Sequence, residues 1–415
     1  MNTHIKSIVV VGGGTAGWMS AAYFVNKGFD VTLIESPNVP NIGVGESCVP
    51  TLVDFVHNLG LKEEEWMPEA NAIHKMGIYH YNWLRNDNTA WKFYFCHNKF
   101  NCDSEWMLDN RKLPAYNLRR YSYHIDAIAF GKMLKNRVVL PRGGKHISSH
   151  IHEVKQNPDG SISGLVLDDD IVVAGDFYID CSGAAKLLSN KVGMKFKPYG
   201  DIPNDRAIAC PQKLERMGAP NYTITYAASN GWIWNTALSH RRGCGYTYSS
   251  AFISDDAAVA EYLQYFPNTD QSKMRIIHFD SQYAVNPLEK NVLAVGLASG
   301  FIEPLEATSI GLIQYYIETF YKILTDKRDP RVFNKAALAI TRDLYEFVLT
   351  NYTFNQRTDS DYWRYYQDLE KKLDTRSMVI ERANRPDEES PIDTQGFFWA
   401  YSWYSKAKHF ELITS

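Results

Sequence analysis

Three observations in the sequence predict an α/β fold built on a parallel sheet. The chain begins with a continuous apolar run, IKSIVVV at residues 5–11, as is typical of a strand buried on both faces. A glycine-rich loop and a helical segment at 18–28 follow, and a second apolar run occupies 29–35. Further apolar strands, at 176–183 and 291–296, return much later in the chain. Strands that alternate with helices in this way predict a parallel sheet.

Composition narrows the class of protein. The 415 residues are 45% hydrophobic and 22% charged, which predicts a large core and two closely joined domains. The net charge is -3 and the basic residues are scattered, so we expect no nucleic-acid partner. No apolar run reaches 18 residues and the N-terminus does not resemble a secretory signal, so no membrane partner and a cytoplasmic location are expected. The six cysteines form no C-x-x-C pair and are expected to be reduced thiols.

The loop after the first strand, GGGTAG, has the spacing of a dinucleotide-binding turn. One glycine permits the turn, one lets the backbone approach a pyrophosphate, and one lets the helix meet the strand. An acidic residue ends the second strand, near the position of a ribose-binding carboxylate. A purely structural glycine turn is the alternative. The predicted cofactor contacts are Gly12, Gly14, Thr15, Ala16, Gly17 and Glu35.

The region after Glu35 favours FAD over NAD. An NAD domain would continue into further βαβ units, whereas here GVGES at 43–47 leads into a long aromatic insertion at 51–120. The chain then returns through an alternating hairpin, at 146–154 and 162–175, to the apolar strand at 176–183. No second G-x-G-x-x-G motif follows, so we expect one interrupted FAD-binding fold and no domain for NAD(P)H.

Two further segments suggest a site. EPLEATSIG at 303–311 lies between an apolar strand and an amphipathic helical pattern, so Thr308 and Ser309 should stand at a helix start, where amides bind anions. An ordinary helix cap is the alternative. In GWIW, Trp232 and Trp234 should share one face of a strand, either as a core wall or as a functional surface. Lys75 lies among small and apolar residues, and from this stretch alone a surface lysine at the end of a strand is the favoured interpretation.

An ordered set of motifs resembles the flavin-dependent halogenases of the tryptophan-halogenase type. The motifs are GGGTAGW (12–18), GVGES (43–47), HKMGIYHYNW (74–83), YHIDAIAF (123–130), FYIDCSG (177–183), GWIW (231–234), GYTYSSAFISDD (245–256), GLASGFIEPLEATSIG (296–311) and RDLYEFVLTNY (342–352). The resemblance implies a Rossmann-like FAD-binding fold of the flavin monooxygenase type, with an inserted sheet, an aromatic substrate region and C-terminal helices. It also implies halogenation with FADH2, O2 and halide.

The resemblance assigns roles to particular residues. Thr308 and Ser309 would bind halide, although Ala307 stands where the family usually has serine. Lys75 would deliver hypohalous acid, with Glu306 as its catalytic partner. Trp232 and Trp234 would form a barrier between flavin and substrate, although Thr236 and Ala237 replace the Ile-Pro of the family signature. Further FAD contacts would be Gly45, Glu46, Leu297 and Ile310.

The expected FAD-binding part is discontinuous, at 1–50, 121–200 and 275–330. The substrate-binding part, packed with it as one unit, would be 51–120, 201–274 and 331–415. The partners implied are a separate flavin reductase and a small aromatic substrate such as an indole or phenol; whether the chain forms a homo-oligomer stays open. His74 and His80 lack companions at metal-ligand spacing, so no metal is predicted.

Residues 312–415 predict two or three helices, at 330–352 and 361–373, with a short aromatic tail. This is shorter than in halogenases that act on free tryptophan, so an open site is expected, with bromide or iodide preferred and free tryptophan a poor substrate. The alternatives to a halogenase are a flavin-dependent aromatic monooxygenase and a non-catalytic flavin-binding module.

Overall fold

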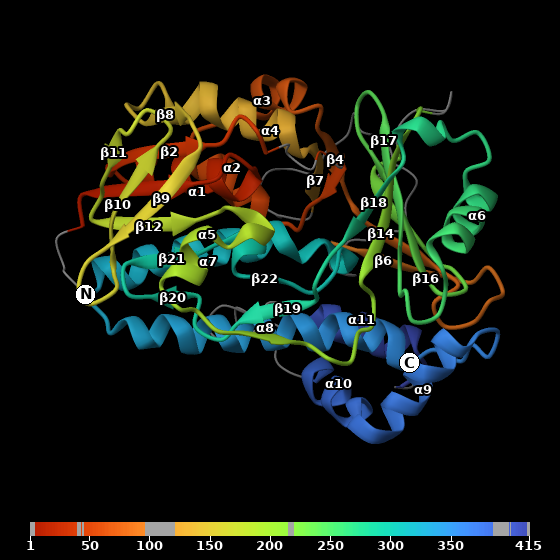
Figure 1. Cartoon of the computed structure of the whole chain (residues 1–415). Helices are drawn as coiled ribbons and strands as arrows, with labels where there is room; N and C mark the ends of the chain where they lie inside the picture. The colour runs from red at the N-terminus through yellow and green to blue at the C-terminus, as the bar shows by residue number, and fades with distance from the viewer. Residues whose placement is uncertain are drawn as a thin grey trace.

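Two large sheets stand side by side above a layer of helices (Figure 1). The computed structural model describes residues 5–39, 43, 45–95, 121–214, 220–384, 398 and 400–412. One sheet has six strands and is mostly parallel, and the other has seven strands and is mostly antiparallel. The α/β class predicted from the sequence is therefore confirmed.

The six-stranded sheet has the order β20-β21-β12-β1-β2-β8. Its neighbours are parallel except for the β20–β21 pair at one edge. Because β1 lies between β2 and β12, the loop that follows it opens at the carboxyl edge of the sheet, where cofactors bind. In the same order, the strands span Leu288–Glu289, Val292–Ala294, Phe177–Asp180, Ser7–Val11, Asp30–Glu35 and Lys145–Ser148.

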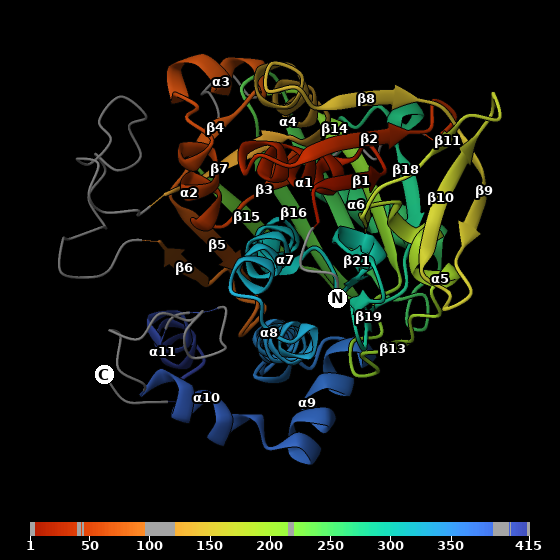
Figure 2. The same cartoon turned by 90° about the vertical axis from the view of Figure 1, so that its left-hand side faces the viewer.

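Alternate residues of β1 pack on opposite faces of this sheet. Ile8 and Val10 belong to a core that includes side chains of α1 and α7, while Val9 and Val11 pack with the small sheet β9-β10-β11. Burial on both faces explains the unbroken apolar run of the sequence. Figure 2 shows α7 between this sheet and α8. These elements span Thr15–Asn26 (α1), Thr308–Thr325 (α7), Ile151–Gln156 (β9), Ile162–Leu167 (β10) and Val172–Val173 (β11).

The first strand of the predicted hairpin is divided in the structure. Its beginning, β8, pairs in parallel with β2 in the six-stranded sheet, and only β9 pairs with β10. The backbone leaves one sheet for the other between Ser148 and Ile151. The alternating pattern predicted strand on both sides of this break and could not show which sheet each part would join.

The seven-stranded sheet has the order β18-β14-β17-β16-β15-β5-β6. Every residue of the central strand β16 is buried. The parallel pair β15–β5 brings the aromatic insertion of the sequence into this sheet. In the same order, the strands span Arg275–His278, Arg206–Gln212, Arg242–Tyr248, Gly231–Ala237, Tyr222–Ala227, Gly77–Tyr81 and Ala90–Tyr94. Residues 96–120 of the insertion lie outside the described part of the chain.

In the described part of the chain, four helices follow α7 and form the lower layer of Figure 1. The two that the sequence predicted are α8 (Pro330–Thr353) and α9 (Asp361–Leu373). The structure adds α10 (Thr375–Ala383) and α11 (Ala400–His409), which pack against each other. The expectation of two or three helices located α8 and α9 but did not locate α10 or α11, because neither of these has a clear apolar period in the sequence.

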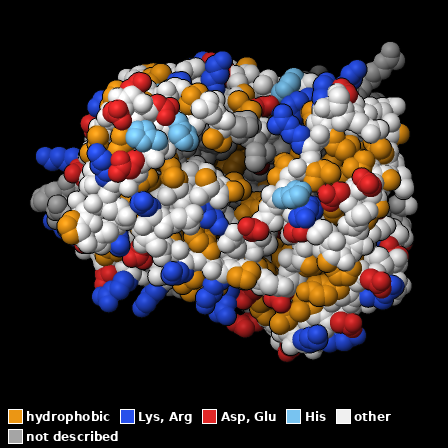
Figure 3. Space-filling model, viewed as in Figure 1, with side chains coloured by type: hydrophobic (Ala, Val, Ile, Leu, Met, Phe, Trp, Pro, Cys, Tyr) orange, Lys and Arg blue, Asp and Glu red, His pale blue; other side chains and the backbone are white. Residues whose placement is uncertain are grey.

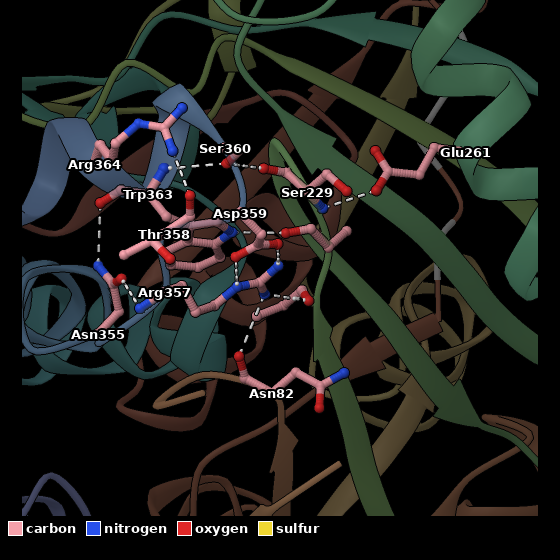
Figure 4. A network of polar contacts seen from close by, with 12 residues as sticks. Asn82, Ser229, Glu261, Asn355, Arg357, Thr358, Asp359, Ser360, Trp363 and Arg364 are labelled. Atoms are coloured by element: carbon pink, nitrogen blue, oxygen red, sulfur yellow. Dashed lines mark hydrogen bonds and ion pairs between the residues drawn. The ribbon is translucent and has the colours of Figure 1, made fainter. Parts of the chain in front are cut away.

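A buried arginine fastens this helical layer to the seven-stranded sheet (Figure 4). Arg357, between α8 and α9, pairs with both carboxylate oxygens of Asp359 at 2.9 and 2.5 Å. It also donates to the carbonyl oxygen of Ala227, at the end of β15, at 2.6 Å, and its guanidinium lies 4.6 Å from the Trp363 ring. The start of α9 is thereby held against the turn that leads into β16.

The remaining elements surround these layers. They are β3 (Gly45–Ser47), α2 (Thr51–Asn58), α3 (Glu63–Glu69), β4 (Ile73–Lys75), β7 (Ser122–Asp126), α4 (Ala127–Leu134), α5 (Leu187–Lys191), β13 (Phe196–Pro198), α6 (Asp255–Tyr265), β19 (Gln282–Ala284) and β22 (Gly300–Phe301). Among the described helices, none combines the length and hydropathy needed to cross a bilayer. Cys48, Cys181, Cys210 and Cys244 are buried free thiols, and the other two cysteines lie outside the described residues.

Candidate active site

The glycine loop between β1 and α1 closely approaches neighbouring backbone. Gly12 has φ +113°, and a Cβ there would lie 2.2 Å from the carbonyl oxygen of Cys181. A Cβ on Gly17 would lie 1.8 Å from the carbonyl oxygen of Gly12. Both positions therefore require glycine, as the loop motif predicted.

The residues around this loop fit a dinucleotide. Gly14 is the N-cap of α1 and offers no side-chain cap, so the first amides of the helix remain available to a phosphate. Glu35 ends the adjacent strand β2, and its Oε2 lies 3.2 Å from His146 Nε2. The helix end can donate amide hydrogen bonds to a pyrophosphate, and the carboxylate beside it can accept a hydrogen bond from a ribose hydroxyl.

A cavity of about 1050 Å³ extends from this loop to the seven-stranded sheet. Its opening belongs to the hollowed centre of the face in Figure 3, where hydrophobic side chains are exposed. The predicted residues that line it are Gly12, Gly14, Thr15, Ala16, Glu35, Gly45, Glu46, Trp232, Trp234, Leu297, Glu306, Thr308, Ser309 and Ile310. Gly17 lies beneath the loop, and Lys75 is not part of the lining.

The start of α7 has unusual backbone geometry. Glu306 and Ala307 both have left-handed conformations, with φ of 65° and 54°. This region is unfavourable for residues with a Cβ, and such strain clusters at functional sites. Ala307 is the N-cap and supplies no side-chain cap, and Thr308 and Ser309 line the cavity, so a helix N-terminus without a side-chain cap lies at the cavity wall.

Glu306 is a buried carboxylate held by neighbouring polar groups. Only 5% of its surface is exposed, and Asn351 Nδ2 on α8 donates to its Oε1 at 2.8 Å. Burial raises the pKa of Glu306, while Lys406, Asn351 and Lys75 oppose that rise. The carboxylate therefore has two buried lysines in its electrostatic surroundings.

Lys75 ends β4 and is fully buried. Its Nζ donates to the carbonyl oxygen of Cys48 at 2.9 Å and lies 4.8 Å from the centre of the Phe95 ring. Burial lowers the pKa of Lys75 to about 7, and nearby Glu306 acts in the opposite direction. The sequence alone favoured a surface lysine here, and the structure excludes that alternative.

Trp232 and Trp234 lie on the same strand, β16, with ring centroids 5.9 Å apart and planes tilted by 53°. Both indoles are largely buried and both line the cavity. The side-by-side placement predicted from strand periodicity is therefore observed. The pair belongs to the hydrophobic core and to the cavity wall at once.

Glu46 on β3 is another carboxylate of the cavity, besides Glu35 and Glu306. Burial, together with the neighbouring Asp126, raises its pKa to about 7. It lies where the backbones of Gly45 and Gly243 come close, since a Cβ on Gly243 would be 2.7 Å from the Gly45 nitrogen. Glycine at both positions therefore lets β3 contact the start of β17.

Three residues near Glu306 had no assigned role in the sequence analysis. Asn351 hydrogen-bonds to the carboxylate, His80 Nε2 lies 3.8 Å from its Oε1, and Lys406 on α11 is fully buried. Asn351 lies in RDLYEFVLTNY, one of the motifs shared with the halogenases, so the sequence could have marked it as a site residue. His80 was considered only as a metal ligand. Across the described residues, no group of three or more His, Cys, Asp or Glu side chains could hold a metal ion.

The fold and the cavity define a nucleotide-cofactor enzyme: a parallel sheet with a glycine loop, joined through one cavity to a second, aromatic sheet. Comparison with known proteins identifies the family. The chain matches the tryptophan halogenase family over residues 7–117 and 105–408, and it belongs to that family.

Individual relatives and solved structures are similar to this chain over most of its length. Tryptophan 6-halogenase SttH of Streptomyces toxytricini is 30% identical over 88% of this chain and 81% of its own length. BrvH, a flavin-dependent halogenase from Brevundimonas sp. BAL3, has a TM-score of 0.85 at 27% identity and covers 100% of this chain and 91% of its own. A tryptophan halogenase from Shewanella frigidimarina has a TM-score of 0.87 at 25% identity, covering 99% and 90%.

The chain is therefore an enzyme of the flavin-dependent halogenase class, with the FAD-binding fold of that class. Family membership implies FAD, supplied as FADH2, together with a halide and an aromatic substrate. Membership of this enzyme family excludes the alternative of a non-catalytic flavin-binding module. The predicted division into FAD-binding and substrate-binding segments stays a prediction.

Proposed function

We propose that this enzyme halogenates small electron-rich arenes, and that Lys75 delivers hypohalous acid to them. One observation carries the proposal: the glycine loop, the helix start with Glu306, Thr308 and Ser309, and the two tryptophans all line one cavity. Bound as FADH2, the flavin would supply with O2 the oxidising power that converts halide into hypohalous acid. The protein's own residues would position the halide, the oxidised halogen and the arene.

Thr308 and Ser309 are the proposed halide site. The N-terminal amides of α7 carry partial positive charge and no side chain caps them. The left-handed Ala307 turns the chain into the helix at this point. A monovalent anion is therefore stabilised at the end of the cavity that also contains Glu306.

Lys75 is the proposed carrier of the halogen. An amine with a pKa of about 7 is in part neutral near pH 7, and a neutral amine can react with an electrophilic halogen or hydrogen-bond to it. Because Lys75 lies outside the cavity lining, hypohalous acid would have to leave the flavin side to reach it. Delivery would in this way be separated in space from halide oxidation.

Glu306 is the proposed base. During substitution the ring attacks the halogen, and the carbon–halogen bond forms as the bond from the halogen to its carrier breaks. The carrier keeps that electron pair: the oxygen of hypohalous acid leaves as water after taking a proton, or Lys75 Nζ is regenerated as the amine. The ring becomes cationic, and the ring carbon then loses its proton. A buried carboxylate next to the ring stabilises that cation and accepts the proton. Glu306 is buried, and the charge of Lys75 acts on its carboxylate. Both properties suit this role.

Trp232 and Trp234 are the proposed barrier between flavin and arene. Two adjacent indoles supply more bulk than any other pair of side chains, and both reach the cavity wall. A substrate kept behind them meets the halogen at Lys75 and does not meet the flavin. This arrangement favours halogenation over direct hydroxylation, the chemistry of the monooxygenase alternative.

For the substrate we propose an open site that accepts indoles and phenols, with bromide or iodide favoured over chloride. The cavity of about 1050 Å³ is at the upper limit of typical ligand sites, which suits a cofactor with a small arene. Bromide and iodide are more easily oxidised than chloride. Free tryptophan is the competing candidate, because relatives such as SttH are tryptophan halogenases.

The test is an assay with FAD, a separate flavin reductase, NADPH, O2, bromide and indole, repeated with phenol and with free tryptophan, and then with chloride or iodide in place of bromide. Haloindole in amounts well above halotryptophan is the expected result. Hydroxylated indole would support the monooxygenase instead, and exclusive chlorination of tryptophan would refute the open site. NADPH without the reductase should leave bound FAD oxidised, because we expect no NAD(P)H domain.

A further inference from the structure

A chain of directed hydrogen bonds ends beside Glu306. Trp83 Nε1 donates to Thr225 Oγ1 at 3.0 Å, and Thr225 Oγ1 lies 2.8 Å from His80 Nδ1. An indole N–H can only donate, so the Thr225 oxygen accepts there and its hydroxyl proton is free to be donated elsewhere. Within the described part of the chain, His80 Nδ1 is the one group within hydrogen-bond distance that could accept this proton, and donation to Nδ1 uses the hydroxyl proton that the opposite direction would leave unused.

This direction favours the tautomer of His80 that has its proton on Nε2. Since Nδ1 accepts the Thr225 proton, the neutral ring must carry its own proton on Nε2. Nε2 is buried, has no hydrogen-bond partner among the described residues, and lies 3.8 Å from Glu306 Oε1. The unpartnered N–H is therefore next to the carboxylate.

The surroundings keep the ring neutral and fix its plane. Burial lowers the pKa of His80 well below its ordinary value, and the positive charges of Lys406, His409 and Lys75 act in the same direction. The facing carboxylate of Glu306 is the opposing charge. The ring stacks on Trp91 with centroids 4.8 Å apart and planes 20° from parallel.

Asn351 and His80 approach the same oxygen of Glu306. Asn351 Nδ2 donates to Oε1 at 2.8 Å, and His80 Nε2 lies nearest to Oε1 as well. We propose that His80 is a positioning residue that donates its Nε2–H to Glu306 Oε1 in the substrate complex and leaves Oε2 to accept the ring proton of the arene. The separation of 3.8 Å is longer than a hydrogen bond, and catalytic hydrogen bonds often shorten only when substrate binds.

This inference rests on the proposed role of Glu306 as the base. It also has a consequence of its own: because Nε2 already carries a proton, His80 does not take the proton from Glu306. The proton must leave the carboxylate by another route. The imidazole acts through the carboxylate and does not touch the arene.

The experiment compares three substitutions at position 80 in the holoenzyme with bromide. His80→Gln places an N–H near the position of Nε2, His80→Asn places one only near Nδ1, and His80→Phe keeps a flat ring on Trp91 without any donor. Loss of one charge-assisted hydrogen bond predicts about tenfold lower kcat for the last two variants, with KM for indole unchanged. Glutamine should restore most of the rate.

A deuterium isotope effect distinguishes a positioning role of His80 from a general loss of structure in the variants. With Glu306 well oriented, loss of the ring proton is fast, so ring-deuterated indole should react at the rate of ordinary indole. In His80→Phe and His80→Asn proton loss becomes slow, and a primary deuterium isotope effect should appear. Thr225→Val, which removes the donor to Nδ1, should show the same effect, whereas Thr225→Ser should not.

Several results would overturn the proposal. They are a wild-type kcat in His80→Phe, an equal loss in the glutamine and phenylalanine variants, and a loss without any isotope effect. Glu306→Gln tests the underlying function separately. If Glu306→Gln halogenates at the wild-type rate, the proposed base is wrong; if it is impaired while His80→Phe is not, only the role of His80 fails.

Discussion

Lys75 and Cys48 are joined by a buried hydrogen bond, in which the lysine Nζ donates to the cysteine carbonyl oxygen at 2.9 Å. The bond holds the amine at the end of β4, and burial lowers its pKa to about 7. An amine in this condition is both fixed in position and partly unprotonated. These two properties suit a halogen carrier and lead to the first prediction.

Replacing Lys75 should remove arene halogenation without removing halide oxidation. Lys75→Ala and Lys75→Arg are both expected to lose at least about 100-fold in kcat, since the guanidinium of arginine stays protonated and cannot act as a nucleophile. FAD binding and hypohalous acid formation, followed by trapping with a chlorination-sensitive dye or thiol, should remain near wild type. Normal halogenation by a folded Lys75→Ala protein would contradict the role of the amine.

Stability should rise with pH because of two buried lysines. Burial lowers the pKa of both Lys75 and Lys406 to about 7, below the ordinary lysine value near 10.5. Between these values the unfolded chain binds more protons than the folded chain, so the free energy of unfolding increases with pH from about 7 to about 10.5. Each lysine contributes a slope of up to about 1.4 kcal/mol per pH unit.

Lys406→Met should therefore flatten this slope over the same range. The measurement is urea unfolding at several pH values from 7 to 10, and Lys195→Met, at an exposed position, is the matched control. The control should keep the full slope. An unchanged slope in Lys406→Met would mean that the buried amine stays protonated throughout.

Local sequence patterns predicted the parts of the site that depend on short-range geometry. The turn after β1 requires glycine because its backbone contacts leave no room for a Cβ, and such a requirement is visible in the residue type. The helix start at Thr308 was predicted from the junction of an apolar strand with an amphipathic pattern, and α7 begins at that residue. The spacing of residue types along the sequence was therefore sufficient to predict the glycine turn and the start of α7.

Long-range pairing explains what the sequence did not show. His80 faces Thr225 because β5 and β15 pair in parallel, with these two residues as register partners. No local pattern encodes that register. Lys406 is buried because α11 packs on α8, where its Nζ donates to the Phe347 carbonyl and to Thr350 Oγ1 at 3.2 Å. Its segment, AYSWYSKAKH, contains too few apolar residues at helical spacing to predict burial.

The tryptophan pair gives a prediction about reaction outcome. Replacing both Trp232 and Trp234 with phenylalanine thins the wall between flavin and arene while keeping aromatic packing on β16. Halogenation should fall, and hydroxylated indole should appear in its place, as measured by product analysis with bromide. Trp66→Phe is the control, because Trp66 is buried against Tyr123 and Phe130 and does not line the cavity. Unchanged products in the double variant would favour a purely structural role.

The last prediction concerns Arg357, which joins the helical layer to the turn before β16 (Figure 4). Its side chain is 1% exposed, pairs with Asp359, and donates to the Ala227 carbonyl at 2.6 Å. Arg357→Met removes the pair with Asp359, whose side chain is 33% exposed, and leaves the buried Ala227 carbonyl without this donor. Loss of that buried hydrogen bond costs about 1–3 kcal/mol of unfolding free energy. Arg364→Met removes an exposed pair with Asp361 and should cost less than about 1 kcal/mol. Urea unfolding of both variants measures the difference, and equal losses would show that the buried arginine does not fasten the two layers.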